Sequence, residues 1–263
     1  MDSTVGQKAE SKADDSDSPL TAAAPRSLGL IVVAAGRGER FGGDKVWEAL
    51  EGQPLVARSL VALAAPPVER VALVVAPSRL AEGRALVAGL AVPAVAVPGG
   101  ARRQDSVRNG LLALGPCEWV AVHDAARPFA TREVLLRTLA AAQATGAAVP
   151  AVPVADTVKR VRDRIVVETL PRAELWAVQT PQVFRGALLA QAHRAAVDDA
   201  TDDAALVERL GARVAIAEGA YNNVKITTPE DMARARVLSE VLSTEYSVST
   251  EGARRVPASR PEQ

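Results

Sequence analysis

A glycine-rich stretch carrying several cations follows the first apolar segment of the chain. Residues 34–45 read AAGRGERFGGDK and include Gly36, Gly38, Arg37, Arg40 and Lys45. Glycines after a strand let backbone N–H groups approach phosphate oxygens closely, and arginine and lysine pair with phosphate charge. Three cations on one short loop repel one another unless they are solvated or face an anion. This pattern predicts a phosphate-binding loop.

The spacing of the loop differs from two common phosphate-binding loops. The dinucleotide fingerprint G-x-G-x-x-G requires glycine at position 41, where the chain has Phe41. The triphosphatase loop G-x-x-x-x-G-K, begun at Gly38, requires lysine at position 44, where the chain has Asp44. The glycines alone fit a structural turn equally well, so the phosphate hypothesis depends on the cations.

Further candidate residues stand at the ends of other apolar segments. Asp124 ends one of them, and a carboxylate there can hold Mg²⁺ or a sugar hydroxyl. His123 alternates to the opposite face and is expected to be a packing residue rather than an acid or base. Lys225 lies between Val224 and Ile226 in a strand-like pattern, where a lysine is unusual. That position favours a functional role for Lys225.

The elements around these residues follow from the hydrophobic pattern. Short apolar runs alternate with helix-like segments, which predicts an α/β, Rossmann-like, mostly parallel sheet with helices on both faces. Ligands bind beyond the carboxyl ends of such strands. Strands are expected at 29–35, 70–76, 91–97, 118–124, 147–154 and 212–218, and helices near 54–65, 78–89, 104–114, 131–145, 185–197, 201–210 and 229–242.

Residues 156–172 break this rhythm because apolar and polar residues alternate there, which predicts a β-hairpin inserted into the α/β domain. An isolated hairpin is marginally stable in water, so a packing partner is expected, and a second subunit is a natural one. The globular domain is expected over 27–242. A disordered extension is expected at 1–26 and a disordered tail at 243–263.

Composition excludes several classes of protein. The 31 basic and 31 acidic residues give a formal net charge of zero, so neither nucleic acid nor a membrane surface is an expected partner. No uncharged apolar run reaches the roughly 18 residues that indicate a membrane span. The single cysteine, Cys117, excludes an intramolecular disulfide framework. The first residues fit neither a secretory signal nor a transit peptide, so a cytoplasmic location is expected.

Seven motifs taken together carry a family resemblance. They are AAGRGERFGGDK at 34–45, GGARRQDSVRNGL at 99–111, VHDAARP at 122–128, PVADTVKR at 153–160, TPQ at 180–182, TDDA at 201–204 and NVKITTPED at 223–231. In this order they resemble the 2-C-methyl-D-erythritol 4-phosphate cytidylyltransferases, a family of sugar-phosphate nucleotidyltransferases. The resemblance implies transfer of the cytidylyl group of CTP to a polyol phosphate in non-mevalonate isoprenoid biosynthesis. It also implies Mg²⁺ as cofactor and a homodimer formed through the hairpin arm.

The resemblance also implies residue roles. The implied catalytic residues are Arg40, Lys45, Arg172 and Lys225. The implied nucleotide-binding residues are Ala34, Ala35, Gly36, Gly38, Gly99, Gly100, Arg103 and Ser106. The implied acceptor-binding residues are Asp124, Ala125, Arg127, Thr157, Thr180 and Thr201, with Asp124 also the metal ligand. The chain departs from the family pattern at Gly43-Asp44 and Val46-Trp47, which surround Lys45 in place of the usual P-K-Q, and at Ala101, where an acidic residue is common.

Several alternatives stay open. Ribitol 5-phosphate cytidylyltransferases share most of these motifs, and a catalytically silent nucleotide-binding relative is a third hypothesis, disfavoured because Arg40, Lys45, Asp124 and Lys225 are all retained. Arg103 fits an exposed cation at a helix start almost as well as a ligand contact. Asp202 and Asp203 fit first-turn helix charges. No general base is expected, because the attacking phosphate is already ionised and catalysis reduces to alignment and charge stabilisation.

Overall fold

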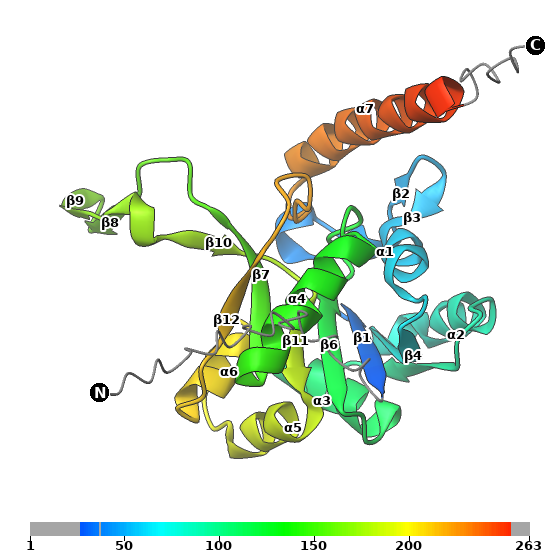
Figure 1. Ribbon diagram of the computed structural model, residues 1–263, viewed down its shortest axis with the longest axis horizontal. Coiled ribbons are helices and arrows are strands. Elements are labelled where there is room, and N and C mark those ends of the chain that lie inside the picture. Colours follow the sequence, from blue (N-terminus) through cyan, green and yellow to red (C-terminus); the bar gives the residue numbers. More distant parts are fainter. Residues whose placement is uncertain (1–26, 37, 254–263) are drawn as a thin grey trace, which may run out of the picture.

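The computed structural model describes residues 27–36 and 38–253, and its centre is an eight-stranded sheet (Figure 1). The strand order is β10-β7-β11-β6-β1-β4-β5, and β12 pairs with β7. The strands are β1 (Leu28–Ala34), β4 (Val68–Val75), β5 (Ala94–Pro98), β6 (Trp119–Asp124), β7 (Ala147–Pro153), β10 (Trp176–Val178), β11 (Gln182–Arg185) and β12 (Ala215–Glu218). Strands β1, β4, β5 and β6 pair in parallel, whereas β10 and β11 are antiparallel to their neighbours. The expected mostly parallel α/β fold is confirmed.

Helices cover both faces of this sheet because alternate residues of each strand point to opposite sides. On one face, Leu30 and Val32 of β1 belong to a core cluster with α1 (Leu55–Leu63), α2 (Leu80–Ala88) and α4 (Arg132–Thr145). On the other face, Ile31 of β1 belongs to a cluster with α3 (Arg103–Leu114), α5 (Gly186–Ala195) and α6 (Asp203–Arg209). Both faces of the central strands are therefore buried, which explains their continuous apolar sequences.

The register of the central strands sets the place of the candidate site. Strand β1 runs between β4 and β6, and Val33 near its end pairs with Asp124 at the end of β6. The chain leaves β1 at Ala34 directly into the glycine-rich loop. The loop and Asp124 consequently lie side by side at the carboxyl edge of the sheet, where α/β proteins bind ligands.

The glycine-rich loop contains one short 3₁₀ turn and ends in a second, and a small hairpin follows. The turns are η1 (Glu39–Phe41) and η2 (Lys45–Trp47), and the hairpin pairs β2 (Ala49–Leu50) with β3 (Gln53–Pro54). Two further 3₁₀ turns are η3 (Pro77–Arg79), directly after β4, and η4 (Arg172–Glu174). The loop is thus folded into turns along most of its length, which fixes where its side chains point.

The inserted segment forms the hairpin that its alternation predicts. Strands β8 (Lys159–Arg162) and β9 (Ile165–Thr169) pair antiparallel, and all of their residues are exposed. The turn uses Asp163 and Arg164, with φ values of 48° and 64°, as a two-residue turn of this hand requires. Figure 1 shows the hairpin projecting well away from the sheet, on a stalk that leaves β7 and returns through β10.

The last helix, α7 (Pro229–Ala253), is longer than the sequence predicts. It begins as expected at Pro229, with the Thr228 hydroxyl accepting from the Asp231 N–H. The domain boundary expected at residue 242 falls inside this helix, which continues to Ala253. The chain has no proline between Pro229 and Pro257, so no residue there excludes a helix. The expected extension at 1–26 and the rest of the tail lie outside the described residues.

Among the described residues, no helix combines the length and the apolar character needed to cross a membrane.

Candidate functional site

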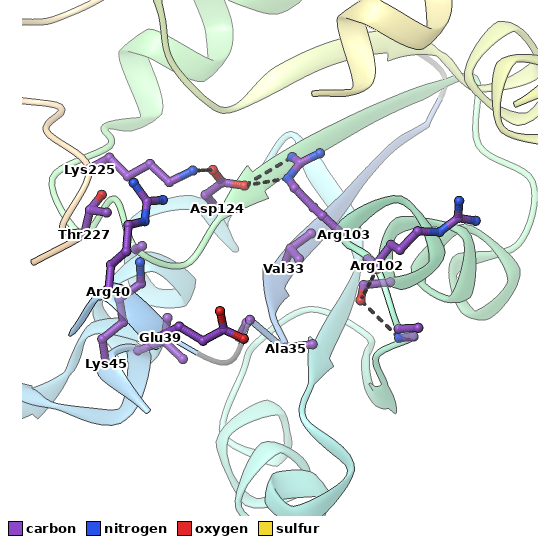
Figure 2. A pocket seen from close by; sticks show the side chains of 18 residues that line it. Val33, Ala35, Glu39, Arg40, Lys45, Arg102, Arg103, Asp124, Lys225 and Thr227 are labelled. Carbon is purple, nitrogen blue, oxygen red and sulfur yellow. Dashed lines mark hydrogen bonds and ion pairs between the residues drawn. The ribbon is translucent and has the colours of Figure 1, made fainter. Parts of the chain in front are cut away.

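A wide cavity of about 520 Å³ opens at the carboxyl ends of β1 and β6. Figure 2 shows that the glycine-rich loop, the start of α3, the end of β6 and the segment around Lys225 surround it. The structure brings together in its lining Ala34, Ala35, Gly36, Gly38, Arg40, Lys45, Gly100, Arg103, Ser106, Asp124 and Lys225, all of which the sequence singles out. Residues from distant motifs therefore form one site. Arg37 lies outside the described residues.

The glycine-rich loop turns tightly at Gly38. Its φ of +63° lies in the left-handed region, and a Cβ there would collide with the carbonyl oxygen of Gly43. The Gly38 carbonyl accepts hydrogen bonds from the N–H groups of Phe41 at 2.8 Å and Gly42 at 3.0 Å. This turn brings Arg40 and Lys45 to one wall of the cavity (Figure 2).

The second glycine pair packs against the first loop. A Cβ on Gly99 would collide with the Cβ of Ala35, so only glycine allows these two loops to approach so closely. The Gly100 N–H donates to the Ser106 hydroxyl oxygen at 3.1 Å, and that hydroxyl donates to the Arg102 carbonyl at 3.2 Å. Ser106 therefore fixes the turn at the start of α3. Its contact with a nucleotide base stays a prediction.

Asp124 lies between two cations in the wall of the wide cavity. The Lys225 ammonium donates to its Oδ2 at 2.6 Å, and the Arg103 guanidinium donates to its Oδ1 at 3.1 and 3.2 Å. Burial alone would raise the pKa of Asp124, but Arg103 and Lys225 outweigh burial and hold that pKa far below its usual range. Asp124 is therefore ionised at all physiological pH values.

The Arg103 side chain also binds a second, fully buried carboxylate. Its Nη1 donates to Asp203 Oδ2 at 2.7 Å, and Asp203 Oδ1 lies 3.0 Å from His193 Nε2. Burial would raise the pKa of Asp203, and the charge of Arg103 with the His193 contact lowers it below the usual value. Arg103 is consequently not the exposed helix-start cation that the sequence allowed. Asp203 joins α6 to α3 and α5.

Sequence reasoning missed the role of Asp203 and did not consider His193. The only available signal is the pair of aspartates in TDDA, and the two have different roles. Asp202 is the N-cap of α6, since its Oδ1 accepts from the Ala205 N–H at 2.9 Å. Asp203 instead points inward to Arg103, a partner 100 positions earlier in the chain. No local pattern reveals a contact of that separation.

A small cavity of about 180 Å³ adjoins the wide one. It is lined by Arg127, Thr180, Thr201 and Asp202 among others, and it shares Arg103, Asp124 and Lys225 with the wide cavity. The Thr180 hydroxyl oxygen accepts from the Asp124 N–H at 3.1 Å, so the two acceptor-binding candidates are connected. The Arg127 guanidinium donates to the carbonyls of Asn223 and Val178, at 2.7 and 3.2 Å.

Besides Gly99, three of the expected site residues line neither cavity. Ala125 is fully buried, and its N–H donates to the Val33 carbonyl at 3.0 Å. Thr157 and Arg172 are exposed at the base of the hairpin, where Arg172 donates to the Ala155 carbonyl at 2.7 Å. A role for Thr157 and Arg172 in binding the acceptor stays a prediction.

The residues of the site do not fit a magnesium ion held by protein ligands alone. Both oxygens of Asp124 already accept hydrogen bonds from Arg103 and Lys225. Arg40 and Lys45 add further positive charge to the same cavity. Within residues 27–36 and 38–253, no three histidine, cysteine, aspartate or glutamate side chains are grouped to hold a metal. A contact of Asp124 with a metal that is also held by phosphate oxygens stays a prediction.

Comparisons with known proteins agree with the motifs. The family model "IspD: 2-C-methyl-D-erythritol 4-phosphate cytidylyltransferase" matches residues 28–240. A relative of that name from Dehalococcoides mccartyi strain 195 is 45% identical over 216 residues, which cover 80% of this chain and 95% of that protein. One from Pelotomaculum thermopropionicum is 48% identical over 222 residues, covering 80% of this chain and 93% of that protein. The crystal structure of the Thermus thermophilus cytidylyltransferase matches with a TM-score of 0.68 and 36% identity, covering 81% of this chain and 99% of that one.

Proposed function

Because the chain belongs to the 2-C-methyl-D-erythritol 4-phosphate cytidylyltransferase family, we propose that it transfers the cytidylyl group of CTP to 2-C-methyl-D-erythritol 4-phosphate. The products are 4-diphosphocytidyl-2-C-methyl-D-erythritol and pyrophosphate. The observation that carries the proposal is the meeting of two cavities at Arg103, Asp124 and Lys225. A wide basic cavity suits a triphosphate, and a small polar one suits a polyol phosphate. The wide cavity also has the volume typical of small-ligand sites.

The proposed reaction joins the two substrates at one phosphorus atom. An oxygen of the acceptor phosphate forms a bond to the α-phosphorus of CTP. The bond from that phosphorus to the bridging oxygen breaks, and its electron pair leaves with pyrophosphate. A phosphate monoester is mostly dianionic near neutral pH, so the protein need not remove a proton. The protein then has to align the acceptor phosphate with the α-phosphorus of CTP and to stabilise the negative charge that develops.

The positions of the cations around the cavities support this proposal. Arg40 and Lys45 line the wide cavity and would contact the triphosphate and its leaving group. Lys225 lines both cavities and would contact the acceptor phosphate beside the α-phosphorus. Asp124 holds Lys225 in place at 2.6 Å and faces the small cavity, where a polyol hydroxyl would bind.

We further propose that magnesium reaches the site bound to the triphosphate. The oxygens of the nucleotide supply the hard ligands that magnesium prefers, whereas the protein supplies mainly cations. When bound, the metal neutralises part of the phosphate charge. This arrangement agrees with the pairing of both Asp124 oxygens with protein cations.

The proposed assembly is a homodimer in which each hairpin reaches the site of the other chain. The hairpin exposes Val161, Ile165, Val166 and Val167, which are between 54% and 69% accessible, and such a surface favours a protein partner. Thr157 and Arg172 at its base would then contact the acceptor phosphate of the neighbouring site. The cytoplasm is the proposed location, because CTP is an intracellular substrate.

The deciding experiment measures pyrophosphate release by the pure protein with CTP and magnesium. Turnover with 2-C-methyl-D-erythritol 4-phosphate, at a much higher kcat/KM than with ribitol 5-phosphate, is the expected result. Turnover with ribitol 5-phosphate alone would replace the acceptor in this proposal. Absence of turnover with both acceptors, in a protein that still binds CTP, would indicate a silent relative.

A further inference from the structure

The segment of the glycine-rich loop just before Lys45 is held by a residue from elsewhere in the fold. Asp44 accepts a hydrogen bond from Arg79 Nε, with Oδ2 at 2.8 Å. Arg79 ends η3, the turn that follows β4, so it lies on an element rigidly attached to the sheet. The same guanidinium lies over the ring of Trp47, 5.4 Å from its centre. Arg79 therefore contacts the loop on both sides of Lys45.

We propose that Arg79 is a positioning residue for the reaction, which fixes Lys45 in the wall of the wide cavity through Asp44 and Trp47. The inference rests on the proposed function, in which Lys45 contacts the triphosphate. Asp44 directly precedes Lys45 in the segment that departs from the family pattern P-K-Q, so the contact gives this chain its own means of holding the loop. Trp47 also packs against the apolar core and connects the loop to it.

The loop needs such an anchor for two physical reasons. Gly42, with a φ of +83°, and Gly43 give the segment before Lys45 more conformational freedom than other residues would. The neighbouring charges also oppose the inward position of Lys45. Burial, Lys225 and Arg40 each lower the pKa of Lys45, so the ammonium would gain by turning outward into water. Asp124 and Asp231 act in the opposite direction, and a contact that holds the loop from outside the cavity adds to their effect.

The Arg79–Asp44 contact is expected to affect the position of Lys45 more than the free energy of folding. The Arg79 and Asp44 side chains are 37% and 32% accessible, and ion pairs of that exposure contribute little to the free energy of folding. A displacement of a catalytic group by about 1 Å can, in contrast, reduce a rate by about 100-fold. Loss of Arg79 is therefore expected to change catalysis while leaving the melting temperature nearly constant.

The test compares Arg79→Ala with a matched control on the same guanidinium. Glu82 binds the other side of Arg79, with Oε1 3.0 Å from Nη1, and does not contact the loop. In Arg79→Ala we expect kcat with CTP to fall by about 10- to 100-fold, with the KM for the acceptor within twofold of wild type. In Glu82→Gln both constants should stay within twofold. Arg79→Lys keeps the positive charge but lacks the planar guanidinium. Its kcat should therefore lie between the values for Arg79→Ala and Glu82→Gln.

A charge exchange gives a second measurement. Asp44→Arg and Arg79→Asp should each lower kcat, and the double variant should recover at least tenfold over the worse single one, because the pair is restored with opposite polarity. The proposal is overturned if Arg79→Ala retains kcat within twofold, or if Glu82→Gln lowers kcat equally. If the wild-type protein has no turnover, the proposed function fails on its own. The same variants are then compared by their CTP affinity, and equal affinities would overturn the positioning role.

Discussion

At the scale of single residues, the site is defined by cations that are held close together before any substrate binds. Burial lowers the pKa of Lys45 most, and the charges of Lys225 and Arg40 lower it further. Asp124 acts in the opposite direction and raises this pKa. A bound triphosphate would relieve this repulsion and return the pKa of Lys45 toward its usual value. We therefore expect relief of the repulsion around Lys45 to contribute to the binding of a triphosphate.

His123 gives a pH prediction that is separate from the carboxylates. Burial lowers its pKa to about 4, against an ordinary value near 6.5. Between these values the unfolded chain binds a proton that the folded chain does not, so the free energy of unfolding falls as the pH falls. Across the whole window the loss is on the order of 3 kcal/mol.

Urea unfolding at pH 7, 6, 5 and 4.5 measures this effect. In His123→Asn the decrease over that range should be much smaller, whatever the stability of the variant at pH 7.

Asp124 and Asp203, whose pKa values are lowered, have the opposite behaviour: their contribution is complete above the unfolded-state pKa near 3.9 and is lost only below it. If the free energy of unfolding changes with pH equally in the wild type and in His123→Asn, the lowered pKa of His123 is contradicted.

At the scale of elements, Asp203 connects three helices through one buried carboxylate. It binds Arg103 of α3 and His193 of α5 from the first turn of α6. Removing one member of a buried ion pair leaves the other charge uncompensated, so Asp203→Ala is expected to lower the free energy of unfolding by about 3 kcal/mol. Urea unfolding at pH 7 measures this loss.

The neighbouring Asp202 is the matched control for that prediction. It caps α6 through the Ala205 N–H, accepts from Gln182 Nε2 at 2.7 Å and is only partly buried, so Asp202→Ala is expected to cost about 1 to 2 kcal/mol. Both variants replace one aspartate by alanine at the same helix end. Equal losses in the two would mean that Asp203 acts as an ordinary first-turn charge.

The elements also show what a sequence can predict. Apart from the end of α7, the long apolar strands and the helices lie within a few residues of their expected positions, because period and turn residues are local signals. Strands β10 and β11 were not expected, since each is short and pairs with strands distant in sequence. In the same way Lys225 and Asp124 were singled out separately, but their 2.6 Å contact across 101 positions has no local signature. The Asp44–Arg79 pair was likewise not foreseeable from the loop alone.

At the scale of the whole molecule, the hairpin raises the question of which chain it serves. Figure 1 shows it directed away from the body, and Thr157 and Arg172 at its base are exposed. If it completes the site of a second chain, subunits of Lys45→Ala and Arg172→Ala are each inactive as homodimers. Mixed dimers contain one site with both residues intact, so they should recover roughly one quarter of wild-type activity at equal mixing.

The mixing experiment needs a control for exchange of subunits. Two differently tagged wild-type preparations, mixed in the same way, establish by co-purification that dimers exchange. Recovery is expected only in mixtures of the two different variants and not in either variant mixed with itself. Full exchange without recovery would place Arg172 in the site of its own chain or outside catalysis.

The shared wall between the two cavities has a consequence for how the substrates influence each other. Arg103, Asp124 and Lys225 line both cavities, so a ligand in either cavity would contact side chains that the other cavity shares. We therefore expect occupation of one cavity to alter the affinity of the other. Thermodynamic linkage would then require the same factor in both directions.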